Sequence, residues 1–191
     1  MKFIILIITA LFYFNLSFGF INYISFDNKC IKQSNGVSFG INEFVCLYNG
    51  SSNSASTSLF TFEIYNSDQI NLTTHHSLYC DYPIASKIFT LNQCSSYGYS
   101  NSYYYVDKSD SMPSIPKGSY LVKQYDACES VQGYWYATNG TTIIDKSGLQ
   151  TTYLCINGVP YENICQGGSC KKINTFKNCD NEDYNSVECS N

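Results

Sequence analysis

The sequence contains no arginine. All eleven basic residues are lysines, charged residues make up only 14% of the 191 residues, and the formal net charge is −4. Arginine binds phosphate and carboxylate groups through two parallel hydrogen bonds, which a lysine ammonium cannot form. This composition makes nucleic acid a poor candidate partner.

Histidine is also scarce, and no motif of an enzyme is present. His75 and His76 are the only two histidines, and neighbours on a strand point to opposite faces, so they are poor joint ligands of a metal. No GxSxG phrase occurs, and a cysteine nucleophile would leave an odd thiol among ten. Paired carboxylates can hydrolyse a glycosidic bond, and several acidic residues lie near expected strands: Glu43, Glu63, Asp81, Asp126 and Glu129. The sequence does not bring any two of them together, so we expect no catalytic residue, no cofactor and no metal site.

Long hydrophobic runs are missing except at the start of the chain. Met1-Lys2 is followed by an almost entirely apolar run over residues 3–14 and by small residues up to Gly19. This pattern is typical of a secretory signal peptide, residues 1–19, with the mature chain beginning at Phe20. The alternative, a membrane anchor, would need an apolar span of roughly 20 residues. We therefore expect a secreted protein with no membrane span in its mature part.

Ten cysteines follow this segment, and a secretory compartment oxidises thiols. They divide into four and six on the two sides of a gap, so each group can close its own disulfides: Cys30, Cys46, Cys80, Cys94, and Cys128, Cys155, Cys165, Cys170, Cys179, Cys189. Sequence does not determine which cysteines pair. Locality alone favours Cys30 with Cys46 and Cys80 with Cys94.

The remaining residues favour strands. Eighteen Tyr and twelve Phe can bury area on a pleated surface. Residues 120–144 show the pattern best, because two alternating segments flank Cys128 and Asn139-Gly140 then predicts a tight turn before a third strand. We predict an all-β protein built of disulfide-stabilised antiparallel hairpins.

Two arrangements of these hairpins remain open: two small β domains, or one elongated, repeat-like array. The first would place a cysteine-rich β domain at residues 20–94 and a second at 119–191 with an irregular C-terminal tail. Residues 95–118 are rich in Ser, Tyr and Pro and would connect the two, with a short strand in their middle. Phrases such as FVCLYNG and YLCINGVP resemble one another, which favours repetition, although compositional bias produces the same similarity.

Surface chemistry supplies the remaining candidate sites. After residue 19, three N-glycosylation sequons begin at Asn49, Asn71 and Asn139, and a glycan would place each of them at the surface. Tyr103, Tyr105 and Trp135 belong to aromatic clusters that offer contact area to a partner. Core packing is the favoured alternative for these rings, because half of the residues of a sheet face inward.

The chain begins with MKFI, contains no arginine, and carries the cysteine phrases KQYDAC and YLCINGVP. In these features the whole chain bears a resemblance to the small secreted, cysteine-rich, Asn/Ser/Tyr-rich proteins of social amoebae. This resemblance implies a secreted or cell-surface role and no particular functional residue. We therefore expect a non-catalytic protein that binds an extracellular glycan or protein. The alternatives are a carboxylate-dependent secreted hydrolase, and a matrix or coat component.

Overall fold

The computed structural model describes residues 19–26, 30, 36–43, 45–49, 58–75, 80–96, 103–145, 147–180 and 183–191. Throughout these ranges the regular structure is β: fifteen strands and no helix. Every strand pair is antiparallel, and the strands form three sheets. The all-β prediction is confirmed.

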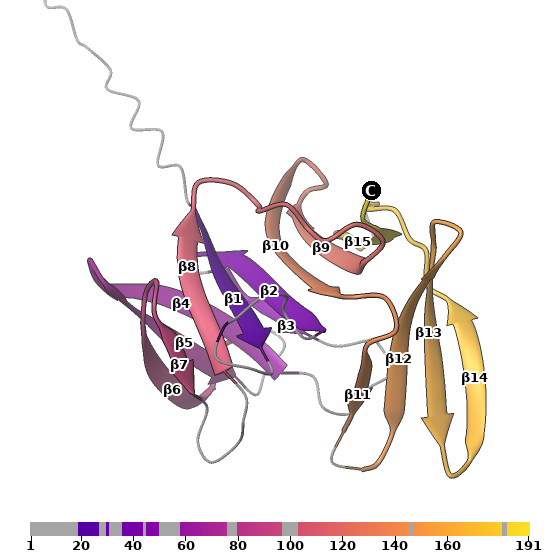
Figure 1. Ribbon diagram of the computed structural model, residues 1–191. Helices are drawn as coiled ribbons and strands as arrows, with labels where there is room; N and C mark the ends of the chain where they lie inside the picture. Colours follow the sequence, from indigo (N-terminus) through magenta and orange to yellow (C-terminus); the bar gives the residue numbers. More distant parts are fainter. Residues whose placement is uncertain are drawn as a thin grey trace, which may run out of the picture.

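A seven-stranded sheet forms the middle of the molecule (Figure 1). Its strands, in spatial order, are β15 (Asn185–Cys189), β9 (Tyr120–Asp126), β10 (Ser130–Ala137), β2 (Val37–Asn42), β1 (Phe20–Phe26), β8 (Tyr103–Ser109) and β7 (Cys94–Ser96). The junction of β10 with β2, from Gly133 opposite Ile41 to Ala137 opposite Val37, joins the two halves of the chain. This sheet therefore does not follow the predicted domain boundary, and the middle of the predicted connection is β8, a strand inside the sheet.

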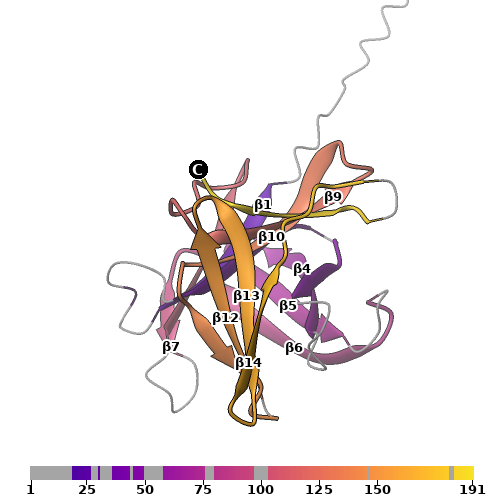
Figure 2. The ribbon, with the colours of Figure 1, turned by 90° about the vertical axis from the view of Figure 1, so that its right-hand side faces the viewer.

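Two four-stranded sheets accompany the central one. The first consists of β3 (Leu47–Asn49), β4 (Ser58–Asn66), β5 (Gln69–His75) and β6 (Pro83–Thr90), in that order. The second consists of β11 (Thr142–Ile144), β12 (Gln150–Ile156), β13 (Val159–Gln166) and β14 (Ser169–Asn174). They lie on the left and right of the view in Figure 1, and Figure 2 shows the second sheet in front of the rest.

One hydrophobic core connects all three sheets. Alternation along each strand of the central sheet sends every second side chain to the same face. Strands of both smaller sheets add their own apolar side chains to it, Phe62 and Ile70 from the first and Tyr153 from the second. The buried members of this core are Ile21, Phe39, Ile41, Leu47, Phe62, Ile70, Phe89, Tyr104, Val106, Tyr120, Trp135, Ala137 and Tyr153.

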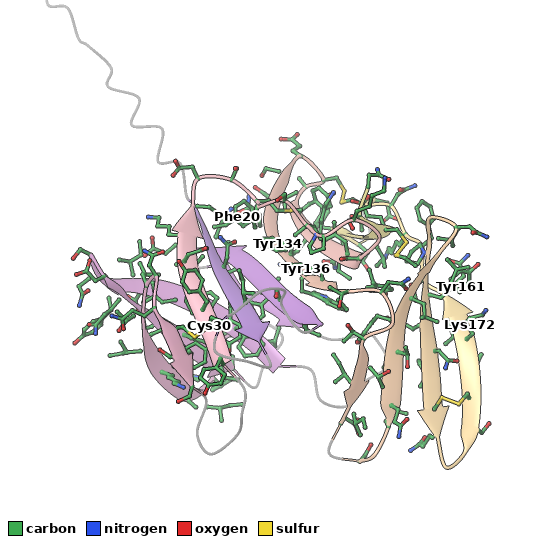
Figure 3. All side chains as sticks on the ribbon, in the orientation of Figure 1. Phe20, Cys30, Tyr134, Tyr136, Tyr161 and Lys172 are labelled. Carbon is green, nitrogen blue, oxygen red and sulfur yellow. A yellow bond between two sulfur atoms is a disulfide. The ribbon has the colours of Figure 1, made fainter. Side chains whose placement is uncertain are left out.

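The opposite face of the central sheet carries a smaller cluster. Phe20, Leu121, Tyr134 and Tyr136 are buried there, and Met112 and Ile115 from the segment after β8 pack against them. Figure 3 labels three of these rings, which lie close together above the sheet. The Tyr134 ring lies directly over Gly40, where a Cβ atom would come within 2.5 Å of its Cε1 atom. Any larger residue at position 40 would displace this ring.

Turn chemistry explains how the second small sheet forms. Asn157 and Gly158, between β12 and β13, both have positive φ. Gly167 and Gly168, between β13 and β14, also have positive φ. Positive φ at both central residues is the requirement of a two-residue hairpin with the right twist. The turn at Asn139-Gly140 is also present, with the Thr141 amide donating to the Thr138 carbonyl at 3.0 Å. That turn, however, leads from β10 into a different sheet, where β11 pairs with β12.

All ten cysteines are paired. The bridges are Cys30–Cys94, Cys46–Cys80, Cys128–Cys179, Cys155–Cys189 and Cys165–Cys170. Each half of the chain closes its own bridges, as predicted, but the two pairings chosen by locality are wrong. Cys30 follows β1 and Cys94 begins β7, and both strands pair with β8. Sheet topology, not distance along the chain, brings these two cysteines together.

The Cys155–Cys189 bridge has a particular structural role. Cys155 lies on β12 of the second small sheet and Cys189 on β15 of the central sheet. The bridge therefore links two sheets covalently. Within the described ranges there is no helix long and apolar enough to cross a membrane.

Candidate binding groove

A groove of about 580 Å³ lies between the central sheet and the first small sheet. This volume is within the range of roughly 300–1,000 Å³ that is usual for small-ligand sites. Apolar and aromatic side chains dominate its lining, which consists of Tyr23, Phe39, Tyr103 and Tyr104 from the central sheet and Phe60, Leu72, Thr74, Ala85, Ser86, Lys87 and Phe89 from the small sheet. A few polar groups within an apolar lining are typical of a ligand site.

Strand alternation places most of the small-sheet residues in the groove. On β6, Ala85, Lys87 and Phe89 share one face, whereas Ser86 and Ile88 share the other. The partners on β5 are in register, with Thr74 opposite Ala85 and Leu72 opposite Lys87. The strand register is irregular at Ile84, between the pairs Thr74–Ala85 and His75–Pro83. The sequence predicts a turn at Pro83 and a strand only from Lys87, whereas β6 begins at Pro83. Nothing in the sequence indicated which sheet this strand would face. The groove was therefore missed.

The aromatic rings of the lining hold one another in place. Tyr23 stacks on Phe39 and on Tyr104, with ring centroids 4.9 Å and 5.7 Å apart, and Phe39 stacks on Phe60 at 5.4 Å. Stacked rings of this kind contribute beyond their buried area, by about 0.5–1.5 kcal/mol a pair. Because the rings also belong to the core or pack against it, the groove is present before any ligand arrives.

Lys87 is the one charged residue among those lining the groove. Its Nζ atom lies 4.8 Å from the ring centroid of Tyr104 and 5.0 Å from that of Phe89. Cation–π contacts at these distances hold the ammonium group over the ring faces. The side chain is exposed, so the groove presents a positive charge next to an apolar floor.

The three residues predicted as partner contacts have three different positions. Tyr103 lines the groove. Tyr105 is half-buried, and its hydroxyl donates to Oδ1 of Asn92 at 3.1 Å. Trp135 is 2% exposed and packs against Tyr120 and Tyr153, so it belongs to the core and is not available to a partner. The competing interpretation, core packing, is correct for Trp135 because its strand directs it toward the junction of two sheets.

Two buried polar clusters lie away from the groove. Glu162 on β13 is 5% exposed and accepts a hydrogen bond of 2.8 Å from the Tyr120 hydroxyl on β9. Burial, and then the charge of Glu162, raise the pKa of Tyr120 well above its usual value. The contact joins the second small sheet to the central sheet, so we interpret it as structural.

The second cluster centres on Asn22, which is also buried. Its amide donates to Oδ1 of Asp107 at 2.7 Å and to Oγ of Ser109 at 2.9 Å, and its oxygen accepts from the Tyr134 hydroxyl at 2.7 Å. Burial raises the pKa of Tyr134, and the neighbouring Tyr136 and Asp107 raise it further. The side-chain amide of Asn22 has its donor and acceptor capacity largely used, which favours a role in holding β1, β8 and β10 in register.

The histidines form no site in the part of the chain that is described. His75 is buried, and its Nε2 atom lies 2.8 Å from Oγ1 of Thr61, whereas His76 lies outside the described residues. Those residues hold no group of three His, Cys, Asp or Glu side chains able to bind a metal ion. The acidic residues considered from the sequence do not gather on one element. Glu43 follows β2, Glu63 lies on β4, Asp81 precedes β6, and Asp126 and Glu129 flank the turn after β9.

The three sequons occupy different places. Asn71 is partly exposed on β5, and Asn139 is exposed in the turn before β11, where its oxygen accepts from the Cys155 amide at 2.8 Å. Asn49 is the last residue of β3, and its side chain lies outside the described part of the structure. Whether these sequons carry glycans stays a prediction.

Fold and groove together define a disulfide-braced, all-β protein with a preformed aromatic groove. The family model for counting factor-associated protein A/B/C matches residues 1–191, so the chain belongs to that family. It is a Dictyostelium family, which confirms the resemblance to social amoeba proteins. No curated protein and no solved structure matches the chain.

Proposed function

We propose that this protein is secreted and non-catalytic, and that it binds an acidic sugar residue of an extracellular glycan in the groove. The observation that carries the proposal is the exposed Lys87 ammonium beside stacked aromatic rings. The C–H face of a sugar ring packs on aromatic side chains, while a carboxylate, sulfate or phosphate on the ring would be attracted to the lysine. The five disulfides fit an oxidising, extracellular environment.

The size of the groove favours a glycan over a folded protein partner. A specific protein interface usually engages about 20–30 residues on each side. Eleven residues line this groove, and its volume suits one compact group. A protein that inserts a single side chain is the alternative occupant, and the experiment below distinguishes it.

The test is binding of the secreted, disulfide-intact protein to an array that carries neutral and acidic glycans with matched backbones. We expect binding to the acidic members, with no release of sugar on prolonged incubation. Ala85→Trp fills the groove from its own wall and should abolish binding. Ile88→Trp is the matched control, because Ile88 lies opposite Asn71 on the other face of the same strand and is 47% exposed.

A separate substitution tests whether the Lys87 charge contributes to binding. Lys87→Gln should weaken binding of acidic glycans about tenfold, which corresponds to about 1.4 kcal/mol of binding free energy. Lys172→Gln is the control, since Lys172 lies over the Tyr161 ring at 5.3 Å on the second small sheet, where Figure 3 labels both residues. Glycan binding that survives Ala85→Trp would refute the groove as the site. Capture of a protein but of no glycan, lost in Ala85→Trp, would replace the glycan with a protein partner.

A further inference from the structure

One face of the first small sheet points toward the core and groove. On the opposite face, which we call outward, Leu59 and His75 are buried at one end, whereas Ile88 on β6 is 47% exposed. Together with Ile84, which is 61% exposed on the same strand, Ile88 forms an exposed apolar strip along β6. Tyr82, just before the strand, is 70% exposed. Strand β6 is also an edge of its sheet. A bare isoleucine strip on an edge strand is a surface on which another chain can pair and aggregate.

Asn71 lies beside this strip. It is the residue of β5 directly opposite Ile88 in the strand register. Its neighbours in sequence, Ile70 and Leu72, face the other way: Ile70 is fully buried in the core and Leu72 lines the groove. The Asn71 side chain therefore shares the outward face with Ile88, and the exposed Ile84 lies farther along the same strand.

The rest of the sequon is on the same face. The Asn71 amide donates to Oγ1 of Thr73 at 3.4 Å, and Thr73 in turn contacts the hydroxyl of Ser86 on β6 at 3.1 Å. The asparagine nitrogen to which a glycan is attached thus lies above the sheet surface, one strand away from the apolar strip. A sugar on this nitrogen has only the outward side of the sheet on which to lie.

We propose that Asn71 carries an N-linked glycan whose first sugar units cover the strip of Ile84 and Ile88. The glycan then replaces water over the apolar side chains and blocks the free edge of β6 from pairing with a second chain. This inference rests on the proposed secretion, because N-glycans are added only in the secretory route. It does not depend on ligand binding in the groove, which is lined mainly by the other face of the sheet.

The experiment uses the full chain, with its own leader, secreted from a eukaryotic cell. N-terminal sequencing first establishes whether the chain begins at Phe20. An amidase that removes N-glycans leaves aspartate at each occupied asparagine, and peptide mass spectrometry should find that conversion at position 71. An unmodified Asn71 in chains that begin at Phe20 would overturn the inference and leave secretion intact. Chains that keep residues 1–19 and lack the glycan would overturn both.

Two substitutions at Thr73 separate the glycan from the side chain. Thr73→Ser keeps the sequon and the hydroxyl and should behave like the natural protein. Thr73→Val removes the sequon, so we expect loss of the glycan mass at Asn71, increased binding of a fluorescent apolar dye, and a shift from monomer toward dimer in sedimentation. Adding Ile84→Lys and Ile88→Lys to Thr73→Val should reverse the last two effects. A Thr73→Val protein that lacks the glycan yet keeps natural dye binding and sedimentation would overturn the covering role.

Discussion

Removal of the Tyr120 hydroxyl should measure how strongly the second small sheet is attached to the central sheet. In Tyr120→Phe the ring stays in the core, but the buried Glu162 carboxylate loses its 2.8 Å donor. A hydrogen bond to a charged group is worth about 1.5–3 kcal/mol, and a buried carboxylate that loses a donor cannot be compensated by water. We therefore expect the free energy of unfolding to fall by about 1.5–3 kcal/mol.

For a chain of this size, each kcal/mol shifts the melting temperature by about 2–4 °C, so the expected decrease is about 3–12 °C. Thermal unfolding followed by circular dichroism, with the disulfides intact, measures it. Tyr105→Phe is the matched control, because its hydroxyl bonds to Asn92 in an exposed position and its loss should cost little.

A double variant tests whether the buried carboxylate without its donor causes this loss of stability. Tyr120→Phe combined with Glu162→Met removes the buried charge along with its donor. Replacement of both members of a buried polar pair by apolar groups of similar shape is often nearly neutral. The double variant should therefore recover much of the lost stability. A single Tyr120→Phe change that leaves the melting temperature where Tyr105→Phe leaves it would refute this account of the sheet junction.

Two further predictions concern the disulfides and alkaline pH. The Cys155–Cys189 bridge closes 34 residues and Cys165–Cys170 closes 5, so replacing the first pair by alanine should cost about 4 kcal/mol and replacing the second about 2 kcal/mol. Denaturant unfolding checks this order, and equal losses would contradict the entropic argument. The pKa of Tyr134 is raised in the folded protein. The neutral phenol therefore contributes fully to the free energy of unfolding below a pH of about 10, the ordinary tyrosine value, and this contribution is lost as the pH rises toward the folded-state pKa. Tyrosinate absorbance should therefore show this phenol ionising only together with unfolding, and early, reversible ionisation of all tyrosines in the folded protein would contradict it.

Strand positions were largely readable from local pattern. Residues 120–144 gave β9, the cysteine turn, β10, the Asn139-Gly140 turn and β11 in the predicted order. Alternation of apolar and polar residues and the turn preference of Asn-Gly are properties of a few neighbouring residues. Local pattern was insufficient where the partner of a strand mattered, because β10 pairs with β2, about ninety residues away in the chain.

The groove was beyond sequence reasoning for the same reason. Tyr103 was chosen for its aromatic character and does line the groove, whereas Trp135 was chosen on the same grounds and is buried in the core. Both are aromatic residues on strands, and nothing nearby in the sequence distinguishes them. Lys87 was not singled out, since a lysine becomes notable only when Tyr104 from another sheet lies beneath it.

The sequence by itself determined the class of structure: strands rather than helices, ten cysteines in two even groups, and few charges. These follow from side-chain shape, chemistry and composition, which each residue carries with it. The tertiary structure alone decided which cysteines pair, which strands share a sheet, and where aromatic rings meet a lysine. Those outcomes depend on contacts between residues far apart in the chain, and such contacts exist only after the sheets have packed against one another.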